Sequence, residues 1–228
     1  MASMFNDIAR RYDQINRTGS LGLDACWRNR LIAMLQKENP THVLDLACGT
    51  GALSWKMCNN LNVNVVGLDL SPEMLQMAKR KGTCNDQSTK QPVFVEGEAE
   101  RLPFEDHHFD AITIAFGIRN FRDRAAALRE AFRVLMPEGR LFILEFATPK
   151  NRVWRFLFGC YFYHILPLWG WALSGNKAAY RYLPQSVSRF PQYDAFCQEL
   201  AGAGFTCVNY RAYTGGVAVL YTGTRKAA

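Results

Sequence analysis

The stretch Val43-Leu44-Asp45-Leu46-Ala47-Cys48-Gly49-Thr50-Gly51 decides how this 228-residue chain folds. It begins as a buried strand and ends in Gly49 and Gly51, which let the backbone turn sharply into a helix and let a ligand lie against bare backbone. Asp69 follows Gly49 by 20 residues, at the end of the next apolar run, where a carboxylate can accept both hydroxyls of a ribose. The stretch therefore predicts a ribose-containing cofactor at the tip of the first strand.

A nicotinamide or flavin dinucleotide is the first alternative for this site. Its fingerprint requires a third glycine three residues after the second, and Ser54 occupies that position here. Asp45 also points a negative charge toward the loop. That charge is unfavourable beside a pyrophosphate and favourable beside the ammonium of a methionine moiety. The dinucleotide alternative is therefore weak.

Strands and helices alternate on both sides of this stretch. Strand-helix alternation predicts a parallel sheet with helices on both faces. The last two apolar runs are joined by Thr214-Gly215-Gly216, which is typical of an antiparallel hairpin. We therefore predict an α/β, doubly wound, mostly parallel seven-stranded sheet with a C-terminal antiparallel hairpin. The expected strands are 41–47, 63–70, 93–99, 110–116, 140–147, 206–213 and 217–225, and the expected helices include 51–61, 73–80 and 123–135.

A polar residue followed by a small one comes directly after the third expected strand, at Glu98-Ala99. This pair fits an adenine lying edge-on to the backbone, with its exocyclic amine reaching a carboxylate or a carbonyl. Taken alone, Glu98 is better explained as a solvated loop acid. As the third member of an ordered series after Gly49 and Asp69, it is better explained as a cofactor contact.

The cysteine pattern and the N-terminus indicate which cellular compartment to expect. The seven cysteines form no CxxC pair, their count is odd and no histidine cluster accompanies them, so no metal site and no disulfide framework is predicted. The N-terminus contains no apolar stretch that could serve as a signal peptide. We expect a cytoplasmic protein in a reducing environment.

The segment 150–193 is basic and aromatic. It carries six Lys and Arg residues, no Asp or Glu, and 12 of the 29 aromatic residues. This composition suits an anionic membrane surface, where each nearby cation contributes about 1 kcal/mol. It would also suit RNA, or the solvated face of a helical cap over the sheet. Residues 153–173 are long enough to cross a bilayer, but Arg155, His164 and Pro167 interrupt them, so we expect a helix across the sheet or at a membrane interface.

The ordered motifs resemble a known family. The set from Asp45 to Gly51, Asp69, 98–104 and Phe109-Asp110 is similar to class I S-adenosylmethionine-dependent methyltransferases. Further segments resemble the ubiquinone/menaquinone biosynthesis C-methyltransferases over nearly the whole chain. These segments are Met4-Phe5, Ile8-Ala9, Tyr12-Asp13, Trp27-Arg28, Phe116-Gly117-Ile118-Arg119-Asn120, Arg133-Val134-Leu135, Glu145-Phe146, 179–184, Phe190-Pro191, Ala203-Gly204-Phe205 and Thr214-Gly215-Gly216.

The resemblance implies an activity and a set of cofactor contacts. The implied activity is C-methylation of a polyprenyl quinol with S-adenosylmethionine as cofactor, with demethylmenaquinol to menaquinol favoured and ubiquinone biosynthesis kept open. Thr50, Asp69, Glu98 and Ala99 carry over as cofactor contacts, and Ala115 occupies a contact position where the family often has serine. The sharp turn and the negative charge that suits a methionine ammonium add Asp45, Gly49 and Gly51 to these contacts.

The reaction requires a nucleophilic ring carbon in line with the activated methyl group, at about 3–3.5 Å. A quinol becomes nucleophilic when a neighbouring hydroxyl loses its proton, so we expect the reduced substrate to be required. Arg119, Tyr12 and Asn120 are the candidate catalytic residues: Arg119 would stabilise a developing quinolate and Asn120 would orient the ring. His164 is a weaker candidate base, and Glu145 is expected to hold Arg119 or the substrate.

The expected organisation is one domain. Residues 1–40 form an N-terminal helical cap, 41–147 the cofactor-binding core, 150–193 the substrate and membrane segment, and 194–228 the closing helix and hairpin. The expected partners are the polyprenyl quinol and the anionic inner face of a membrane, with no nucleic acid and with a homo-oligomer left open. A methyltransferase of another lipophilic molecule and a non-catalytic subunit of a quinone-biosynthesis complex are the open alternatives.

Overall fold

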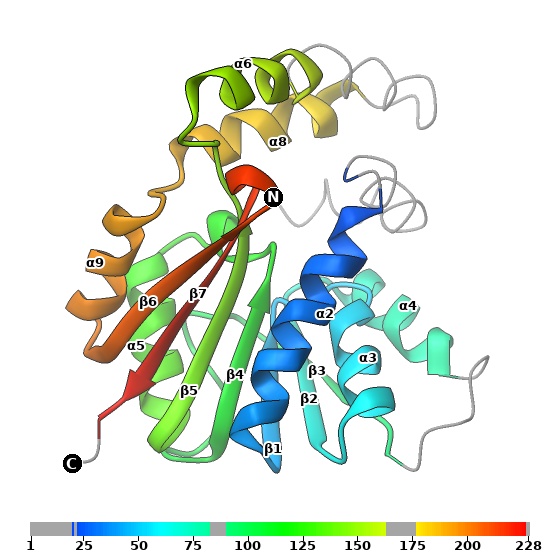
Figure 1. Ribbon diagram of the computed structural model, residues 1–228. Coiled ribbons are helices and arrows are strands. Elements are labelled where there is room, and N and C mark those ends of the chain that lie inside the picture. Colours follow the sequence, from blue (N-terminus) through cyan, green and yellow to red (C-terminus); the bar gives the residue numbers. More distant parts are fainter. Residues whose placement is uncertain (1–19, 21, 83–89, 163–176, 227–228) are drawn as a thin grey trace.

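The computed structural model of the chain describes residues 20, 22–82, 90–162 and 177–226. A seven-stranded sheet in the order β3-β2-β1-β4-β5-β7-β6 forms its centre (Figure 1). The strands are β1 (His42–Leu46), β2 (Asn64–Asp69), β3 (Val93–Glu96), β4 (Phe109–Ala115), β5 (Leu135–Phe146), β6 (Phe205–Tyr213) and β7 (Ala218–Arg225). Strands β1 to β5 are parallel, and β7 runs antiparallel to both β5 and β6. The predicted fold class is confirmed.

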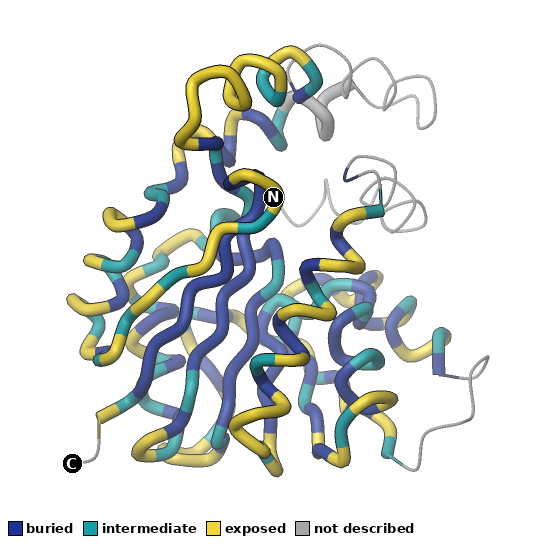
Figure 2. The backbone as a smooth tube through the Cα atoms, in the orientation of Figure 1, coloured by how far each residue is buried: buried dark blue, intermediate teal, exposed yellow. Residues whose placement is uncertain are grey.

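Helices cover both faces of the sheet. They are α2 (Leu23–Leu35), α3 (Ala52–Asn60), α4 (Pro72–Gly82), α5 (Arg124–Val134), α6 (Arg152–Cys160), α8 (Lys177–Arg189) and α9 (Asp194–Gly202), with short 3-10 turns η1 (Gln36–Glu38), η2 (Ile118–Asn120) and η4 (Thr214–Gly216). Apolar residues of α2 and α3 pack on one face and those of α5 and α9 on the other. The central strands are buried between these layers (Figure 2), as expected for parallel strands covered on both sides.

Two helix starts follow from local sequence. In α4 the Ser71 hydroxyl accepts a hydrogen bond from the Met74 N–H at 3.2 Å, and Pro72 is the first helical residue. In α5 the Asp123 carboxylate accepts from the Ala126 N–H at 2.9 Å. Both are side-chain caps that satisfy an orphan N–H of the first turn. They fix where both helices begin, within one residue of the starts expected at 73 and 123.

Five strands agree with the prediction to within one residue at each end, and two differ by more. The third ends at Glu96 instead of Ala99, because a turn closed by the Arg101 N–H on the Glu98 carbonyl (3.2 Å) follows it and buries Ala99 in the core. The fifth begins at Leu135 instead of Arg140, because Leu135 pairs with Phe109 across an irregular register at the start of β4. Both differences lie at strand ends, where tertiary contacts outweigh the local pattern.

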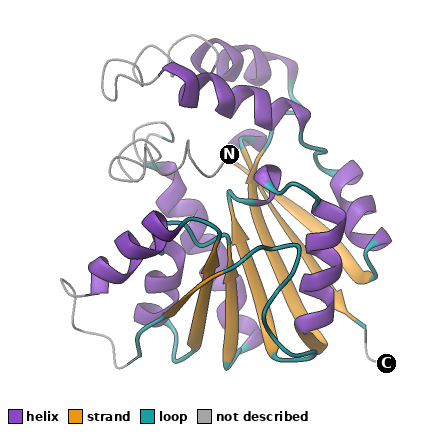
Figure 3. Cartoon of the chain, turned by 180° about the vertical axis from the view of Figure 1, so that it is seen from behind, coloured by secondary structure: helices purple, strands orange, loops and turns teal. Residues whose placement is uncertain are grey.

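Helices α6 and α8 form a separate layer above the edge at which the parallel strands end, called here the carboxyl edge (Figures 1 and 3). The pattern did not assign α8, which contains Pro184 and therefore lacks one helical N–H. Helix α6 covers the start of the expected 153–173 helix, and residues 163–173 lie outside the described part. Within the described residues, no helix is long and apolar enough to cross a bilayer.

Candidate functional site

The turn after β1 gives the carboxyl edge its shape. Ala47, Gly49 and Gly51 all have positive φ, at 56°, 56° and 71°. The Cys48 N–H donates to the Leu68 carbonyl of β2, and the Gly51 N–H donates back to the Cys48 carbonyl, both at 3.0 Å. The left-handed conformation costs a residue with a side chain about 1–2 kcal/mol, and such strain is concentrated at functional sites.

The two glycines of this turn face different surroundings. A Cβ added to Gly51 would lie 2.8 Å from the Phe94 ring and 3.0 Å from the Ala78 Cβ, whereas a Cβ on Gly49 would meet nothing within 4 Å. Gly51 therefore allows α3 to approach β3 and α4 closely. Gly49 leaves open the space that a ligand on the turn would take.

This contrast gives a testable difference. We expect Gly51→Ala to lower the free energy of unfolding by about 2–4 kcal/mol, through backbone strain and overpacking. Gly49→Ala should cost only about 1–2 kcal/mol of strain, but its methyl group should obstruct cofactor binding. Urea unfolding and cofactor titration of both variants measure the two effects. Equal losses of stability in the two variants would contradict the assignment.

Asp69 joins the tip of β2 to the turn. Its carboxylate accepts hydrogen bonds from the Gly49 N–H at 2.7 Å and the Ser71 N–H at 2.9 Å. Burial raises the pKa of this carboxyl group, and the backbone donors oppose the rise. A carboxylate offers about four acceptor positions. Beyond its backbone donors, the carboxylate keeps acceptor capacity for the predicted bond to ribose hydroxyls.

Asp45 lies underneath the turn, fully buried. Its carboxylate accepts from the Ser54 hydroxyl at 2.5 Å and the Thr113 hydroxyl at 2.9 Å. Burial raises its pKa to about 6, although both hydroxyl bonds lower it. Asp45 is too deeply buried to be offered to a ligand directly, so it would act on one through its charge and through the shape of the turn.

The Cys48 thiol reports the electrostatics of the turn. Burial raises its pKa, and the nearby charges of Asp45 and Asp69 raise it further. Two carboxylates that disfavour a thiolate on the turn will favour a cation there. Thr50, also on the turn and buried, accepts a hydrogen bond from the Lys81 ammonium at 2.9 Å.

The elevated pKa of Asp45 predicts a pH dependence. Because the pKa is raised, Asp45 takes up a proton on folding, so its contribution to the free energy of unfolding falls as the pH rises from about 4 to about 6. A bound cation favours the carboxylate form. We therefore expect the affinity for a cationic cofactor to rise about tenfold between about pH 5 and about pH 7. Calorimetric titration with the cofactor at several pH values measures this change. In Asp45→Asn the affinity should depend less on pH. If its dependence on pH equalled that of the wild type, another group would be responsible.

Glu98, Ala99 and Ala115 stand at the same edge of the sheet. Glu98 is exposed just past β3, Ala99 is buried beneath it, and Ala115 is partly exposed at the end of β4. Their positions agree with a ligand that lies across the ends of three strands.

Arg119 and Glu145 form a buried ion pair beside this edge. Arg119 Nη1 lies 2.6 Å from Glu145 Oε1, and the two side chains are 6% and 0% exposed. The same nitrogen donates to the Phe116 carbonyl. Burial raises the pKa of Glu145, opposed by the charge of Arg119. Glu145 thus holds Arg119, as expected, and the buried Arg119 Nε has no partner among the described residues.

Asn120 is held from the helical layer. The Tyr182 hydroxyl of α8 donates to Asn120 Oδ1 at 2.9 Å, across 62 residues of sequence. Burial raises the pKa of Tyr182, so its phenol keeps the proton that makes this bond. The structure brings Arg119 and Asn120 together in η2. Tyr12 and His164 lie outside the described residues.

Helix α2 brings a further charged group that was not predicted as a site residue. The Arg28 guanidinium pairs with Asp24, four residues earlier, and lies 5.3 Å from the Phe116 ring centroid. Its charge lowers the pKa of Asp45, which places it near the turn. Its buried Nε has no partner within the described residues. The Asp-to-Arg spacing of four was the available signal, but it is also common on solvated helices.

Aromatic side chains line the edge between α2 and the helical layer. Phe116 and Phe146 lie 4.6 Å apart, and Trp27 packs against both at 6.2 and 5.9 Å between ring centroids. Phe146 continues to Phe162 at 6.5 Å. Trp27, Phe116 and Phe162 are buried and Phe146 is half-buried, so this row is a packed aromatic cluster next to the Arg119 and Asn120 pair.

The residues present fit S-adenosylmethionine. The open space over Gly49, the Asp69 carboxylate at the tip of β2 and the negative charge beneath the turn suit a ribose attached to a cationic sulfur compound. The negative charge of a pyrophosphate at this turn would be repelled by the Asp45 and Asp69 carboxylates.

The match to known proteins covers nearly the whole chain. A family model described as the ubiE/COQ5 methyltransferase family matches residues 1–225. The chain belongs to this family. Within it, a demethylmenaquinone methyltransferase of Thermus thermophilus is 44% identical, covering 97% of this chain and 100% of the relative. The ubiquinone/menaquinone biosynthesis C-methyltransferase UbiE of Geotalea uraniireducens is 38% identical, covering 97% and 94%. The predicted family and methyltransferase activity are confirmed.

Solved structures of lower identity share the fold of this family member. The [4+2]-cyclase SpnF superposes with a TM-score of 0.71 at 14% identity, covering 100% of this chain and 95% of the cyclase. A SAM-dependent methyltransferase from Thermotoga maritima gives a TM-score of 0.65 at 18% identity, covering 97% and 100%. At these identities the likeness shows the fold alone.

Proposed function

We propose that this ubiE/COQ5 family enzyme transfers a methyl group from S-adenosylmethionine to a ring carbon of a polyprenyl quinol, with demethylmenaquinol to menaquinol as the favoured reaction. The observation that carries the cofactor assignment is the turn 47–51, open over Gly49 and negatively polarised by Asp45 and Asp69. The names of the relatives, demethylmenaquinone methyltransferase and UbiE, support the quinol.

The cofactor contacts follow from the position of each residue. Asp69 would accept the ribose hydroxyls while it holds the turn through Gly49. Glu98 and Ala99 would contact the adenine, and Thr50 and Ala115 would flank the methionine side. When bound, the cofactor supplies a methyl group on a sulfonium. Every remaining requirement of the reaction, above all a nucleophilic carbon, has to come from the substrate and the chain.

Arg119 would stabilise the negative charge that develops on the substrate oxygen. An arginine is unsuited to act as an ordinary base, but its donors can lower the pKa of a bound hydroxyl or water. Arg119 Nη1 donates to both the Glu145 carboxylate and the Phe116 carbonyl, so the guanidinium is oriented before the substrate binds. Asn120, held by Tyr182, would orient the ring, and Tyr12 is the remaining candidate for handling the proton.

The redox state of the substrate tests this mechanism. Only the reduced ring carries a hydroxyl whose deprotonation makes the neighbouring carbon nucleophilic. We expect methyl transfer to the quinol and at least about a hundredfold slower transfer to the quinone, because the quinone lacks the oxyanion that Arg119 stabilises. Anaerobic assays with and without a chemical reductant measure this. Equal rates for both forms would contradict the mechanism.

We also propose that the substrate reaches the site from a membrane. The basic aromatic segment 150–193 would collect a lipid-dissolved quinol at an anionic surface, and the aromatic row from Trp27 to Phe162 would guide its tail.

The quinone content of cells tests the proposed reaction. In cells lacking the protein, the quinone pool should contain the demethylated species. A normal quinone profile in such cells would exclude the proposed methylation.

A further inference from the structure

Helix α6 turns its apolar face outward. Val153 and Phe156 are each 70% exposed and Leu157 is 52% exposed. These residues follow the i, i+3, i+4 spacing of one helical face, and the exposed Cys160 continues it. No residue of α6 is buried. An amphipathic helix of a globular domain normally turns such a face to the core, so this one requires an external partner.

The orientation of α6 is fixed by its opposite face. The Trp154 indole N–H donates to the Thr214 carbonyl at 3.0 Å, and Phe158 stacks on Phe162 at 4.8 Å. The Asn151 carboxamide caps the helix by accepting from the Val153 and Trp154 N–H groups, both at 3.0 Å. The helix is therefore anchored to the η4 turn and to the aromatic layer, with Val153, Phe156 and Leu157 on its outer side.

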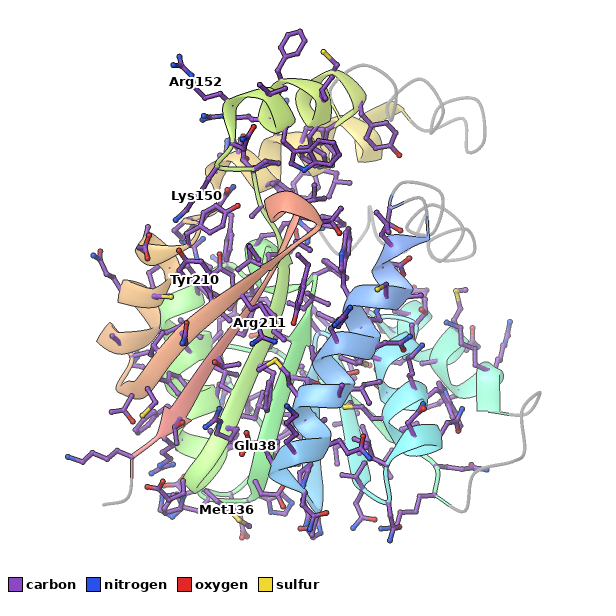
Figure 4. All side chains as sticks on the ribbon, in the orientation of Figure 1. Glu38, Met136, Lys150, Arg152, Tyr210 and Arg211 are labelled. Atoms are coloured by element: carbon purple, nitrogen blue, oxygen red, sulfur yellow. The ribbon has the colours of Figure 1, made fainter. Side chains whose placement is uncertain are left out.

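Positive charge borders this face. Arg152 and Arg155 are both exposed; Arg152 flanks the apolar face, whereas Arg155 follows Trp154 toward the opposite side of the helix. Figure 4 shows Arg152 pointing away from the body of the protein. Lys150 turns toward Tyr210 at 2.9 Å and also contacts Asp194 at 3.4 Å. Between residues 150 and 193 the sequence contains no Asp or Glu. The face is thus apolar in its centre and has Arg152 at one border, within a segment that carries no acidic residue.

We propose that α6 is a membrane-docking helix whose outer face enters the headgroup region of an anionic lipid bilayer. Apolar side chains flanked by the exposed Arg152, on a helix with a second exposed arginine and no acidic residue, match a surface that offers acyl chains beneath negative headgroups. The inner face of α6 continues through Phe158 and Phe162 to Phe146 at the carboxyl edge, so a membrane on the outer face would lie close to the proposed path of the quinol tail. This inference rests on the proposed function.

Vesicle binding tests the docking helix. The full chain should co-sediment with vesicles of phosphatidylcholine and phosphatidylglycerol in equal amounts, and poorly with phosphatidylcholine alone. The double variant F156S/L157S should bind about tenfold more weakly or worse, because two apolar side chains no longer enter the lipid. The variant R152Q/R155Q should lose the preference for the anionic vesicles. Val93→Ser is the matched control: Val93 is 61% exposed at the amino end of β3, and its loss should leave binding unchanged.

Three outcomes would overturn the docking helix: full vesicle binding by F156S/L157S, equal binding of the wild type to both vesicle types, or an oligomer that F156S/L157S dissociates. The last would assign α6 to contact between copies of the chain. A soluble short-tailed quinol separates this test from the proposed function. F156S/L157S should methylate it at the wild-type rate and lose activity only on a long-tailed quinol in vesicles. A wild type that methylates neither substrate would instead refute the proposed function.

Discussion

Asp69→Ala is expected to reduce the affinity for S-adenosylmethionine by about a hundredfold or more, which corresponds to about 3 kcal/mol. The substitution removes the proposed ribose acceptor and also frees the Gly49 N–H, so the turn loses the group that holds it to β2. Isothermal titration calorimetry measures the affinity. Thermal unfolding shows whether the variant remains folded.

Asp110→Ala is the matched control for this prediction. Asp110 also accepts from two backbone N–H groups, those of Thr41 and His42, but it lies at the opposite end of β1. Its loss should lower stability and leave cofactor affinity within about threefold of the wild type, since it would remove no contact to the ligand. If both variants lost affinity equally, Asp69 would act through stability and not as a ligand.

Arg119→Ala is expected to reduce turnover by about 10²–10³-fold while cofactor affinity changes little. The substitution removes the donor for the developing oxyanion. It also leaves Glu145 buried without its partner, which should cost about 3–5 kcal/mol of stability. Single-turnover kinetics and cofactor titration, performed separately, distinguish the chemical step from binding.

Two further variants separate catalysis from stability at this position. Arg119→Lys retains the charge but loses the planar fork, so it should recover part of the stability and little of the turnover. Arg133 is a structural arginine that bonds Glu130, Asp106 and the Phe104 carbonyl. Arg133→Ala should therefore lower stability with turnover retained. Unchanged turnover in Arg119→Ala would remove this residue from the mechanism.

The cofactor half of the fold could be predicted from short-range patterns. Gly49, Gly51 and Asp69 lie in one strand-turn-helix-strand unit, where residue spacing determines position. The caps Ser71 and Asp123 act within three residues, so local chemistry alone located the starts of α4 and α5. The strand bounds were less accurate, because β3 ends and β5 begins where tertiary contacts place them.

The substrate half could not be predicted in the same way. The bond from Tyr182 to Asn120 joins α8 to η2 across 62 residues, and no local pattern announces it. In the cofactor half, the hydrogen-bond partners of Asp45 were not predicted either. Ser54 and Thr113 reach its carboxylate only after α3 and β4 pack against β1. Arg28 reaches the site through the packing of α2 on the sheet. Each of these contacts depends on topology more than on spacing.

The measurement that tests the central claim most directly is transfer of a ¹³C-labelled methyl group. The wild-type enzyme is incubated anaerobically with labelled S-adenosylmethionine and reduced demethylmenaquinone, and the product is examined by NMR. We expect a new labelled methyl resonance on a ring carbon, absent in Asp69→Ala. A label on a quinol oxygen, or no transfer to the reduced substrate, would contradict it.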